Sequence, residues 1–425
     1  MTQDAVGIMR KLRDEAMPMH RALSDLPYIK ALMSHQLTLP SYVNALRALA
    51  VIHSVLEEEI EEADSGAVRA VWSDDLRKYP LLQSDLAFFG PRAVGDVTEA
   101  LDAAVEVTKS IRHIRLDRPV ALLGYVYVLE GITLGHRLHM PDITTTFRLK
   151  DLDGYRYVNS YGESVHRHWD EFSAKMNAAL CDPGEQEAVL EGARELFHSL
   201  KGIYTQLYPL DLSKQSRHVT RINPEAGVHP IPERDDEIEA ALAASQRGWE
   251  AFPYYAARYG ERGKRFSDSD TCWLVTLTRL DQESFTRQID WIARVLASRG
   301  MPSIMLEETL RYLEQELRSL APPDGASYAL LGEAANSFRD ARLSAMSDQS
   351  AREHIVRFER ATAGCDGAIG RVGELLVCAA TDEANGMDNA IESLRSWLAD
   401  RDRFGEAWCT SVESTIQAVS AAVRL

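Results

Sequence analysis

The stretch Leu122–His136 reads LLGYVYVLEGITLGH, a long apolar run interrupted by three glycines. Its composition favours a buried helix, although each glycine inside a helix costs about 1 kcal/mol relative to alanine. Gly131 and Gly135 are four residues apart and therefore share one helix face, where the backbone carries no side chain. Such a face suits either close helix–helix packing through small residues or a flat ligand that lies against the backbone.

Helical periodicity continues around this stretch. Apolar residues from Tyr42 to Ile60 recur in steps of three and four, which predicts a helix beginning after the start signal Thr38–Ser41. Similar stripes over 161–180 and 189–200 predict two more helices. No segment alternates apolar and polar residues between turn signals, so a substantial sheet is not expected. The predicted fold class is all-α.

The second half of the chain has the same helical character. A helix is expected over Ile238–Tyr259 with a break at Gly260, and Ser267–Asp270 offers side-chain acceptors for the start of the next helix. A later helix should stop at Gly300, because a glycine just past the last turn, with proline following, is a strong stop signal. The second half is therefore also predicted to be helical.

The length of the chain indicates two domains. Its 425 residues exceed one compact core, and domains of about 200 residues each are the expectation. Residues 209–236 contain four prolines and little periodic pattern, and proline blocks helix propagation. This segment is predicted to be a linker between a first domain over 1–208 and a second helical domain over 237–425.

The charge balance narrows the possible partners. Lys and Arg number 47 against 64 Asp and Glu, giving a formal charge of −17. Both halves are acidic, with 25 basic and 32 acidic residues in 1–225 (−7) and 22 and 32 in 226–425 (−10). Such a chain is not expected to bind nucleic acid.

Membrane association and a disulfide scaffold are not expected either. The longest strongly apolar stretch, Pro119–Leu129, is too short to span a membrane, and no signal-peptide pattern is present. Five scattered cysteines form no C-x-x-C pair, which argues against a zinc site as well as disulfides. We expect a cytoplasmic protein, and the sequence leaves its oligomeric state open.

The histidines are concentrated in the first half. Eleven of the twelve lie between His20 and His229. Histidine is the commonest side-chain metal ligand, so if the protein has a metal or heme site, the first half is expected to hold it. His20 stands near a helix among methionines and apolar residues, in the sequence Met17-Pro18-Met19-His20. Taken alone, such a histidine is more often a packing residue than a ligand.

In order and spacing, these features resemble the heme oxygenases, especially the bacterial, bacteriophytochrome-associated type. The resemblance covers about residues 8–205 and rests on His20, the helix after Thr38, and YVLEG (Tyr127–Gly131) with Gly135. The sequences Tyr161-Gly162 and WDEF (Trp169–Phe172) add to it. It implies a heme oxygenase-like helical bundle in the first domain.

The resemblance also implies roles for individual residues. His20 matches the proximal ligand of the heme iron, and Gly131 and Gly135 match the distal glycines that leave room for O₂. Arg13 matches a basic residue that holds a heme propionate in some members. Residues late in the domain do the same in the family, and the candidates here are Arg156, Tyr157, Tyr161 and Arg167.

Two residues depart from the family's distal motif. His136 stands where a second glycine is usual, and its ring could either ligate the iron or point sideways and leave the pocket open. Ile132 stands where the family has a polar residue that supports proton delivery. The resemblance still implies a heme-cleaving enzyme that yields biliverdin, CO and iron, with His136 counted among the catalytic residues. The departures favour the alternative of a heme sensor or carrier without turnover.

Two further points follow from the motifs. Glu163-x-x-His166 has the spacing of carboxylate-bound iron sites in helical proteins, so a non-heme di-iron oxygenase of the same fold is a third possibility. The chain has no flavin or nicotinamide motif, and a separate reductase or ferredoxin would have to supply the electrons. In the second half, Tyr255–Gly263 with Trp273 and Trp291 is either core packing or a functional surface.

Overall fold

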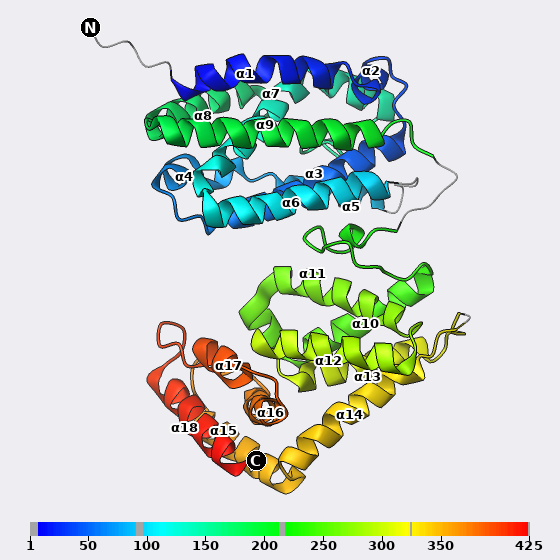
Figure 1. Ribbon diagram of the computed structural model, residues 1–425, viewed down its shortest axis with the longest axis vertical. Coiled ribbons are helices and arrows are strands. Elements are labelled where there is room, and N and C mark those ends of the chain that lie inside the picture. The colour runs from blue at the N-terminus through cyan, green and yellow to red at the C-terminus, as the bar shows by residue number, and fades with distance from the viewer. Residues whose placement is uncertain (1–6, 91–96, 212–216, 324, 424–425) are drawn as a thin grey trace. The chain divides into compact units, whose positions relative to one another are not determined.

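A computed structural model describes residues 7–90, 97–211, 217–323 and 325–423 (Figure 1). These described residues form α-helices and short 3₁₀ turns and contain no strand, which confirms the all-α prediction. The chain divides into two compact units, Met1–Val228 and His229–Leu425. The division falls inside the proline-rich segment 209–236.

Nine α-helices are described in the first unit. They are α1 (Ile8–Ser24), α2 (Pro27–Met33), α3 (Leu39–Glu61), α4 (Gly66–Val71), α5 (Tyr79–Phe89), α6 (Thr98–Asp117), α7 (Leu122–Phe147), α8 (Val165–Ala179) and α9 (Pro183–Gln206). Short 3₁₀ turns lie at Asp74–Leu76, Pro119–Ala121, Gly162–Ser164 and Val219–Arg221. Helix α9 packs against α1, α6 and α7, and α3 packs against α5 and α6 (Figure 1).

Helix α3 forms the centre of this core. The Thr38 side chain accepts a hydrogen bond from the Ser41 amide, and Pro40 lies in the first turn, as the start signal predicts. By length and composition α3 could cross a membrane, but 89 % of its most apolar 18-residue window is buried inside the protein. Burial of this kind is typical of a core helix.

Helix α7 contains the glycine-interrupted stretch and runs through all three glycines. At Gly124, a β-carbon would lie 2.1 Å from the Val189 carbonyl oxygen and 2.6 Å from the Ala193 amide nitrogen, both on α9. No side chain fits in that gap. Close helix–helix packing therefore explains Gly124.

The predicted helical stripe over 161–180 begins later than expected. Helix α8 starts at Val165, and Tyr161 lies just before it in an irregular segment. Gly162 has a φ of 50°, a left-handed conformation that interrupts helix propagation. Tyr161 is therefore not on the same helix as the residues that follow it.

Part of the proline-rich segment packs into the first unit, while residues 212–216 lie outside the described residues. Val219, Thr220 and Asn223 are buried, and the 3₁₀ turn at 219–221 lies against α3. The His218 imidazole is within hydrogen-bonding distance of the Asp102 carboxylate on α6, at 3.0 Å. This part of the segment belongs to the core of the first unit.

The described helices of the second unit are α10 to α18. They are α10 (Asp235–Ala251), α11 (Pro253–Leu277), α12 (Gln282–Ser298), α13 (Ser303–Leu317), α14 (Ala329–Ala345), α15 (Asp348–Thr362), α16 (Val372–Ala384), α17 (Ala390–Leu398) and α18 (Glu406–Ala422). Helix α12 ends at Ser298 with Arg299 as its C-cap, and Gly300 follows with a φ of 84°, as its stop signal predicts.

The prediction for the start of α11 was wrong. The first helix ends at Ala251, earlier than predicted, and Ser267–Asp270 lies inside α11. The predicted break at Gly260 is present, because this residue has non-helical backbone angles (φ 55°, ψ −160°). Two local interactions explain the interior position of Ser267–Asp270. Lys264 forms an ion pair with Asp268 one turn later, and the Thr271 hydroxyl donates to the Ser267 carbonyl oxygen. Residues of the types that commonly cap helices therefore lie in the interior of α11, where they interact with residues one turn away.

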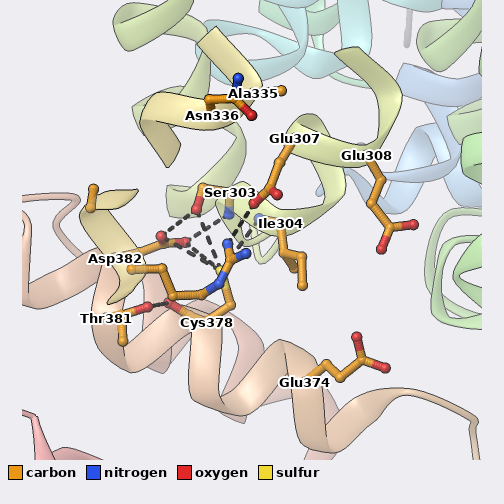
Figure 2. Close-up of polar contacts among 12 residues, drawn as sticks. Ser303, Ile304, Glu307, Glu308, Ala335, Asn336, Glu374, Cys378, Thr381 and Asp382 are labelled. Atoms are coloured by element: carbon orange, nitrogen blue, oxygen red, sulfur yellow. Dashed lines mark hydrogen bonds and ion pairs between the residues drawn. The ribbon is translucent and has the colours of Figure 1, made fainter. Parts of the chain in front are cut away.

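A buried polar cluster holds the start of α13 (Figure 2). The Asp382 carboxylate accepts hydrogen bonds from the Ser303 amide at 2.7 Å and the Ser303 hydroxyl at 2.5 Å. The Cys378 sulfur lies 3.3 Å from the Ile304 amide nitrogen, and burial raises the pKa of this thiol to about 12. Asp382 and Cys378 thus satisfy backbone donors that α13 leaves open at its start.

Candidate functional site

The glycines of α7 do not share one explanation. A β-carbon on Gly131 would meet only the Trp169 ring, at 4.0 Å, and one on Gly135 would meet nothing within 4 Å. This differs from Gly124, where backbone atoms of α9 leave no room. Helix packing therefore does not account for Gly131 and Gly135, and the backbone beside Gly135 faces open space.

His20 lies on an exposed face of α1. Its ring packs edge-on near the Phe197 ring of α9, with centroids 6.1 Å apart. No side chain in the described part of the protein hydrogen-bonds to the His20 imidazole. Helix α1 runs through Pro18, so His20 stands on a formed helix. Because its imidazole has no hydrogen-bond partner among the described residues, both ring nitrogens remain available.

Arg13 connects this face of α1 to α7. Arg13 is exposed and precedes His20 by seven residues, which places the two on one side of the helix. Burial raises the pKa of the Tyr127 hydroxyl on α7 to about 12, and the Arg13 charge opposes that rise. Helices α1 and α7 also both pack against α8 and α9. Arg13 of α1 is therefore close enough to Tyr127 of α7 for its charge to act on that hydroxyl.

His136 is directed toward the polar interior. Its ring packs edge-to-face on the Tyr157 ring with centroids 5.2 Å apart. Its Nδ1 atom is buried and has no hydrogen-bond partner in the described part of the chain. Burial, with smaller contributions from His139 and His53, lowers the pKa of His136 to about 3. The imidazole is therefore neutral at physiological pH.

A network that the sequence did not reveal continues from Tyr157. The His53 Nε2 atom is 3.3 Å from the Tyr157 hydroxyl, and its Nδ1 atom is 3.1 Å from the Glu57 carboxylate. Glu57 also accepts hydrogen bonds from the Lys78 and Tyr79 amides. His53 and Glu57 are four residues apart on the helix predicted after Thr38, but nothing in the sequence showed that both are buried against Tyr157 and the start of α5.

Tyr161 belongs to a second buried group. The Lys78 ammonium lies 3.1 Å from the Glu130 carboxylate and 2.7 Å from the Tyr161 hydroxyl, which itself donates to Glu130 at 2.8 Å. The Tyr161 ring stacks on His168. Because its hydroxyl is engaged in this way, the propionate role predicted for Tyr161 gains no support here.

The remaining candidates lie at the surface. Arg167 is exposed and 3.8 Å from Glu171, and the Arg156 side chain is 3.8 Å from Asp153. Glu163 is almost fully exposed and pairs with Arg137 at 3.0 Å. Among the described residues, no three histidine, cysteine or carboxylate side chains gather as a metal site would require. Nothing in these positions supports a di-iron centre.

Comparisons with known proteins bear on the first unit. The model of the heme oxygenase family matches residues 7–205. Among solved structures, the heme oxygenase of Leptospira interrogans is 18 % identical and covers 47 % of this chain and 100 % of its own, with a TM-score of 0.43. Heme oxygenase-1 of Synechocystis sp. PCC 6803, solved with heme, is 17 % identical and covers 48 % of this chain and 93 % of its own, with a TM-score of 0.44. No curated protein matches the chain.

Proposed function

We propose that residues 7–205, a domain of the heme oxygenase family, bind heme through His20 and open it to biliverdin, CO and iron. One observation carries the proposal beyond the family match. The backbone of α7 at Gly131 and Gly135 is not approached by the backbone of another helix, so the protein's own packing does not explain these two glycines.

The side chains present fit heme. His20 offers a nitrogen ligand that no described residue occupies, and Gly131 and Gly135 offer backbone that a flat macrocycle can approach. Arg13 offers a positive charge for a propionate. When bound, heme supplies both the iron that activates O₂ and the ring that is cleaved. The chain's own residues then have to orient the macrocycle and control the protons around it.

His136 affects the proton supply through its position. On an ideal helix, residue 136 lies about 100° around the axis from Gly135, and its ring is held against Tyr157. Held there, the imidazole does not cover Gly135, where a β-carbon would meet nothing within 4 Å. Ile132 adds no polar atom there, so we propose that ordered water and backbone groups carry the protons that this reaction consumes.

The second candidate function is heme binding without turnover, as in a sensor or carrier. The observation that favours it is Ile132, which provides no hydrogen-bonding group beside the bare glycines. A sensor that used His136 as a second ligand would show a six-coordinate, low-spin ferric spectrum. On replacement of His136 by glycine, that spectrum would change to the water-ligated form.

One experiment separates the two functions. The full-length protein is mixed with one equivalent of hemin and supplied in air with ferredoxin, its reductase and NADPH, because the chain has no flavin or nicotinamide motif of its own. Loss of the Soret band with growth of a bilin band, together with released CO, is the expected result. A heme spectrum that persists through many equivalents of reductant would contradict turnover and support the binding-only function.

A further inference from the structure

The second unit contains a largely apolar pocket, partly open to solvent, that the proposed heme function does not use. Its volume is about 200 Å³, and its walls come from α11, α12, α13 and the turn after α12. Aromatic and aliphatic side chains predominate in the lining, among them Tyr255, Tyr259, Phe266, Trp273, Leu274 and Leu296. For scale, a cavity of roughly 150 Å³ lined by apolar residues can hold benzene.

Contacts outside the cavity hold its aromatic walls in place. The Tyr255 ring stacks on Trp249 with centroids 5.0 Å apart and an angle of 14° between the planes. The Tyr259 hydroxyl donates to the Arg299 carbonyl oxygen at 2.8 Å, and the Trp273 ring meets the Trp291 ring edge-to-face. Residues of the Tyr255–Gly263 segment, together with Trp273, thus form one wall of the cavity.

One polar side chain of the lining stands apart from the rest. The Ser267 hydroxyl is 3.0 Å from the Ser245 hydroxyl, and the hydroxyls of Thr271 and Thr309 donate to carbonyl oxygens of their own helices. For the Asp270 carboxylate, no hydrogen bond or ion pair is found within the described part of the protein. Asp270 neither caps a helix nor joins two helices.

Burial and the charge of Arg299 act in opposite directions on the pKa of Asp270. Burial raises the pKa of Asp270 to about 6, and the charge of Arg299 at the exposed side of the lining opposes the rise. Asp270 in turn adds to the rise in the pKa of the Tyr255 hydroxyl. At pH 7.5 the carboxylate is therefore largely ionised, and no group in the described part of the protein donates a hydrogen bond to it.

We propose that this cavity binds a small amine, with an apolar body of about one aromatic ring against the aromatic walls and an ammonium group on Asp270. An ammonium supplies the missing donor and the opposite charge, and aromatic faces attract cations as well. The acidity of residues 226–425, with 22 basic against 32 acidic residues, also favours a cationic ligand. This inference is independent of heme binding by the first unit.

The test uses the full-length protein and three probes of similar shape at pH 7.5. They are 2-phenylethylamine, the neutral 2-phenylethanol and the anionic 3-phenylpropanoate. Binding is followed by titration calorimetry and by the change in the tryptophan fluorescence of the protein, to which Trp273 in the lining contributes. We expect saturable binding of the amine, at least tenfold weaker binding of the alcohol, and no binding of the carboxylate.

Two substitutions with the same change of charge complete the test. Asp270→Asn keeps the shape of the side chain and should weaken amine binding at least tenfold while leaving alcohol binding unchanged. Asp290→Asn, on the exposed side of α12, should change neither. Tighter binding of the carboxylate than of the amine would show that Arg299 defines the site and would overturn the proposal. So would an unaltered amine affinity in Asp270→Asn, or the absence of saturable amine binding.

The melting temperature gives a further criterion. Because no group among the described residues hydrogen-bonds to Asp270, its replacement leaves no donor without an acceptor. The melting temperature of Asp270→Asn should therefore equal or exceed that of the parent protein. A fall of several degrees would show that Asp270 has a structural role and would contradict the assignment of a ligand site. Leu296→Phe, which fills part of the cavity, should abolish binding of the amine and of the alcohol together.

Discussion

The His136 ring packs edge-to-face on the Tyr157 ring, with centroids 5.2 Å apart, and its buried Nδ1 atom has no partner among the described residues. A protonated imidazole there would be a buried charge without compensation. This contact fixes the side chain that departs most from the family's distal motif. It also makes a prediction about stability against pH.

Replacing His136 by phenylalanine should reduce the acid sensitivity of the fold. The pKa of His136 is about 3 in the folded protein and about 6.5 when unfolded, so between these values the unfolded state binds more protons. This contribution therefore destabilises the fold as pH falls from 6.5 toward 3, by roughly 1 kcal/mol per pH unit.

The measurement is urea unfolding of the parent protein and of His136→Phe at pH 7 and pH 5. The difference between the two proteins isolates His136, because Asp85, whose pKa burial raises to about 6, acts in the opposite direction in both. The variant should lose less stability than the parent between these pH values. Equal losses would show that His136 can be protonated without cost and does not lie in a desolvated place.

Replacing Gly124 or Gly135 of α7 by alanine should change the stability of the protein in opposite directions. Gly124→Ala places a β-carbon 2.1 Å from the Val189 carbonyl oxygen, and overpacking of this kind costs typically 1–3 kcal/mol. Gly135→Ala meets nothing within 4 Å and should stabilise the heme-free protein by up to about 1 kcal/mol, because alanine favours helix. The same methyl would intrude on the face that we propose for heme, so heme affinity should fall.

Unfolding by urea and titration with hemin provide the two readouts for these glycines. We expect Gly124→Ala to lower stability, and Gly135→Ala to lower heme affinity without lowering stability. If Gly135→Ala bound heme as tightly as the parent protein, the bare face of α7 would not be the heme surface.

The sequence predicts a feature well when the interactions that determine it join residues close together in the chain. The start of α3 depends on Thr38 and Ser41, three residues apart, and was predicted correctly. The start of α11 was not, because Ser267–Asp270 suits a helix cap and a helix interior equally well until the Lys264–Asp268 pair is known. Local signals locate helices but do not always identify their ends.

The interior of the candidate site depends on contacts between distant segments. Lys78 meets Glu130 and Tyr161 from positions 52 and 83 residues away in the chain, and nothing near Lys78 distinguishes it from a surface lysine. Likewise, Gly124 and Gly135 have the same identity and helical setting, and only the approach of α9 to Gly124 separates their roles. Such differences appear only when the packing of the helices is known.

The buried ion pair of Lys78 and Glu130 should be essential for stability. Lys78→Met removes the ammonium from a place where it is 1 % exposed and leaves the Glu130 carboxylate buried without its counter-charge. Breaking one side of such a pair costs about 3–5 kcal/mol. Lys109→Met breaks an exposed pair with Glu106 and should cost less than about 1 kcal/mol.

Urea unfolding followed by far-UV circular dichroism measures the loss of stability in both variants, from the transition of the first unit. A loss in Lys78→Met as small as that in Lys109→Met would mean that Glu130 finds another donor. In that case the Tyr161 hydroxyl, which already donates to Glu130 at 2.8 Å, would be the first to test, by Tyr161→Phe in the Lys78→Met background.

A chain that ends at Val228 should fold and bind heme by itself. All the residues that we propose for heme precede this position, and the first unit is compact up to Val228. A chain that ends at Asp211 lacks the buried Val219 and the His218–Asp102 contact, so it should melt at a lower temperature. Calorimetry and hemin titration check this, and heme binding that required residues 229–425 would contradict it.

His20→Ala should weaken heme binding, abolish turnover and leave the heme-free fold intact. His20 is exposed and its imidazole has no hydrogen-bond partner in the described part of the protein, so removing the ring leaves no other group without its partner. His113→Ala, at an exposed position of α6, is the matched control and should behave as the parent protein. Added imidazole should restore a histidine-like ferric spectrum to His20→Ala, since the ring it lost is the ligand. A His20→Ala protein with an unaltered spectrum, or one that imidazole does not change, would mean that the iron is held by another residue.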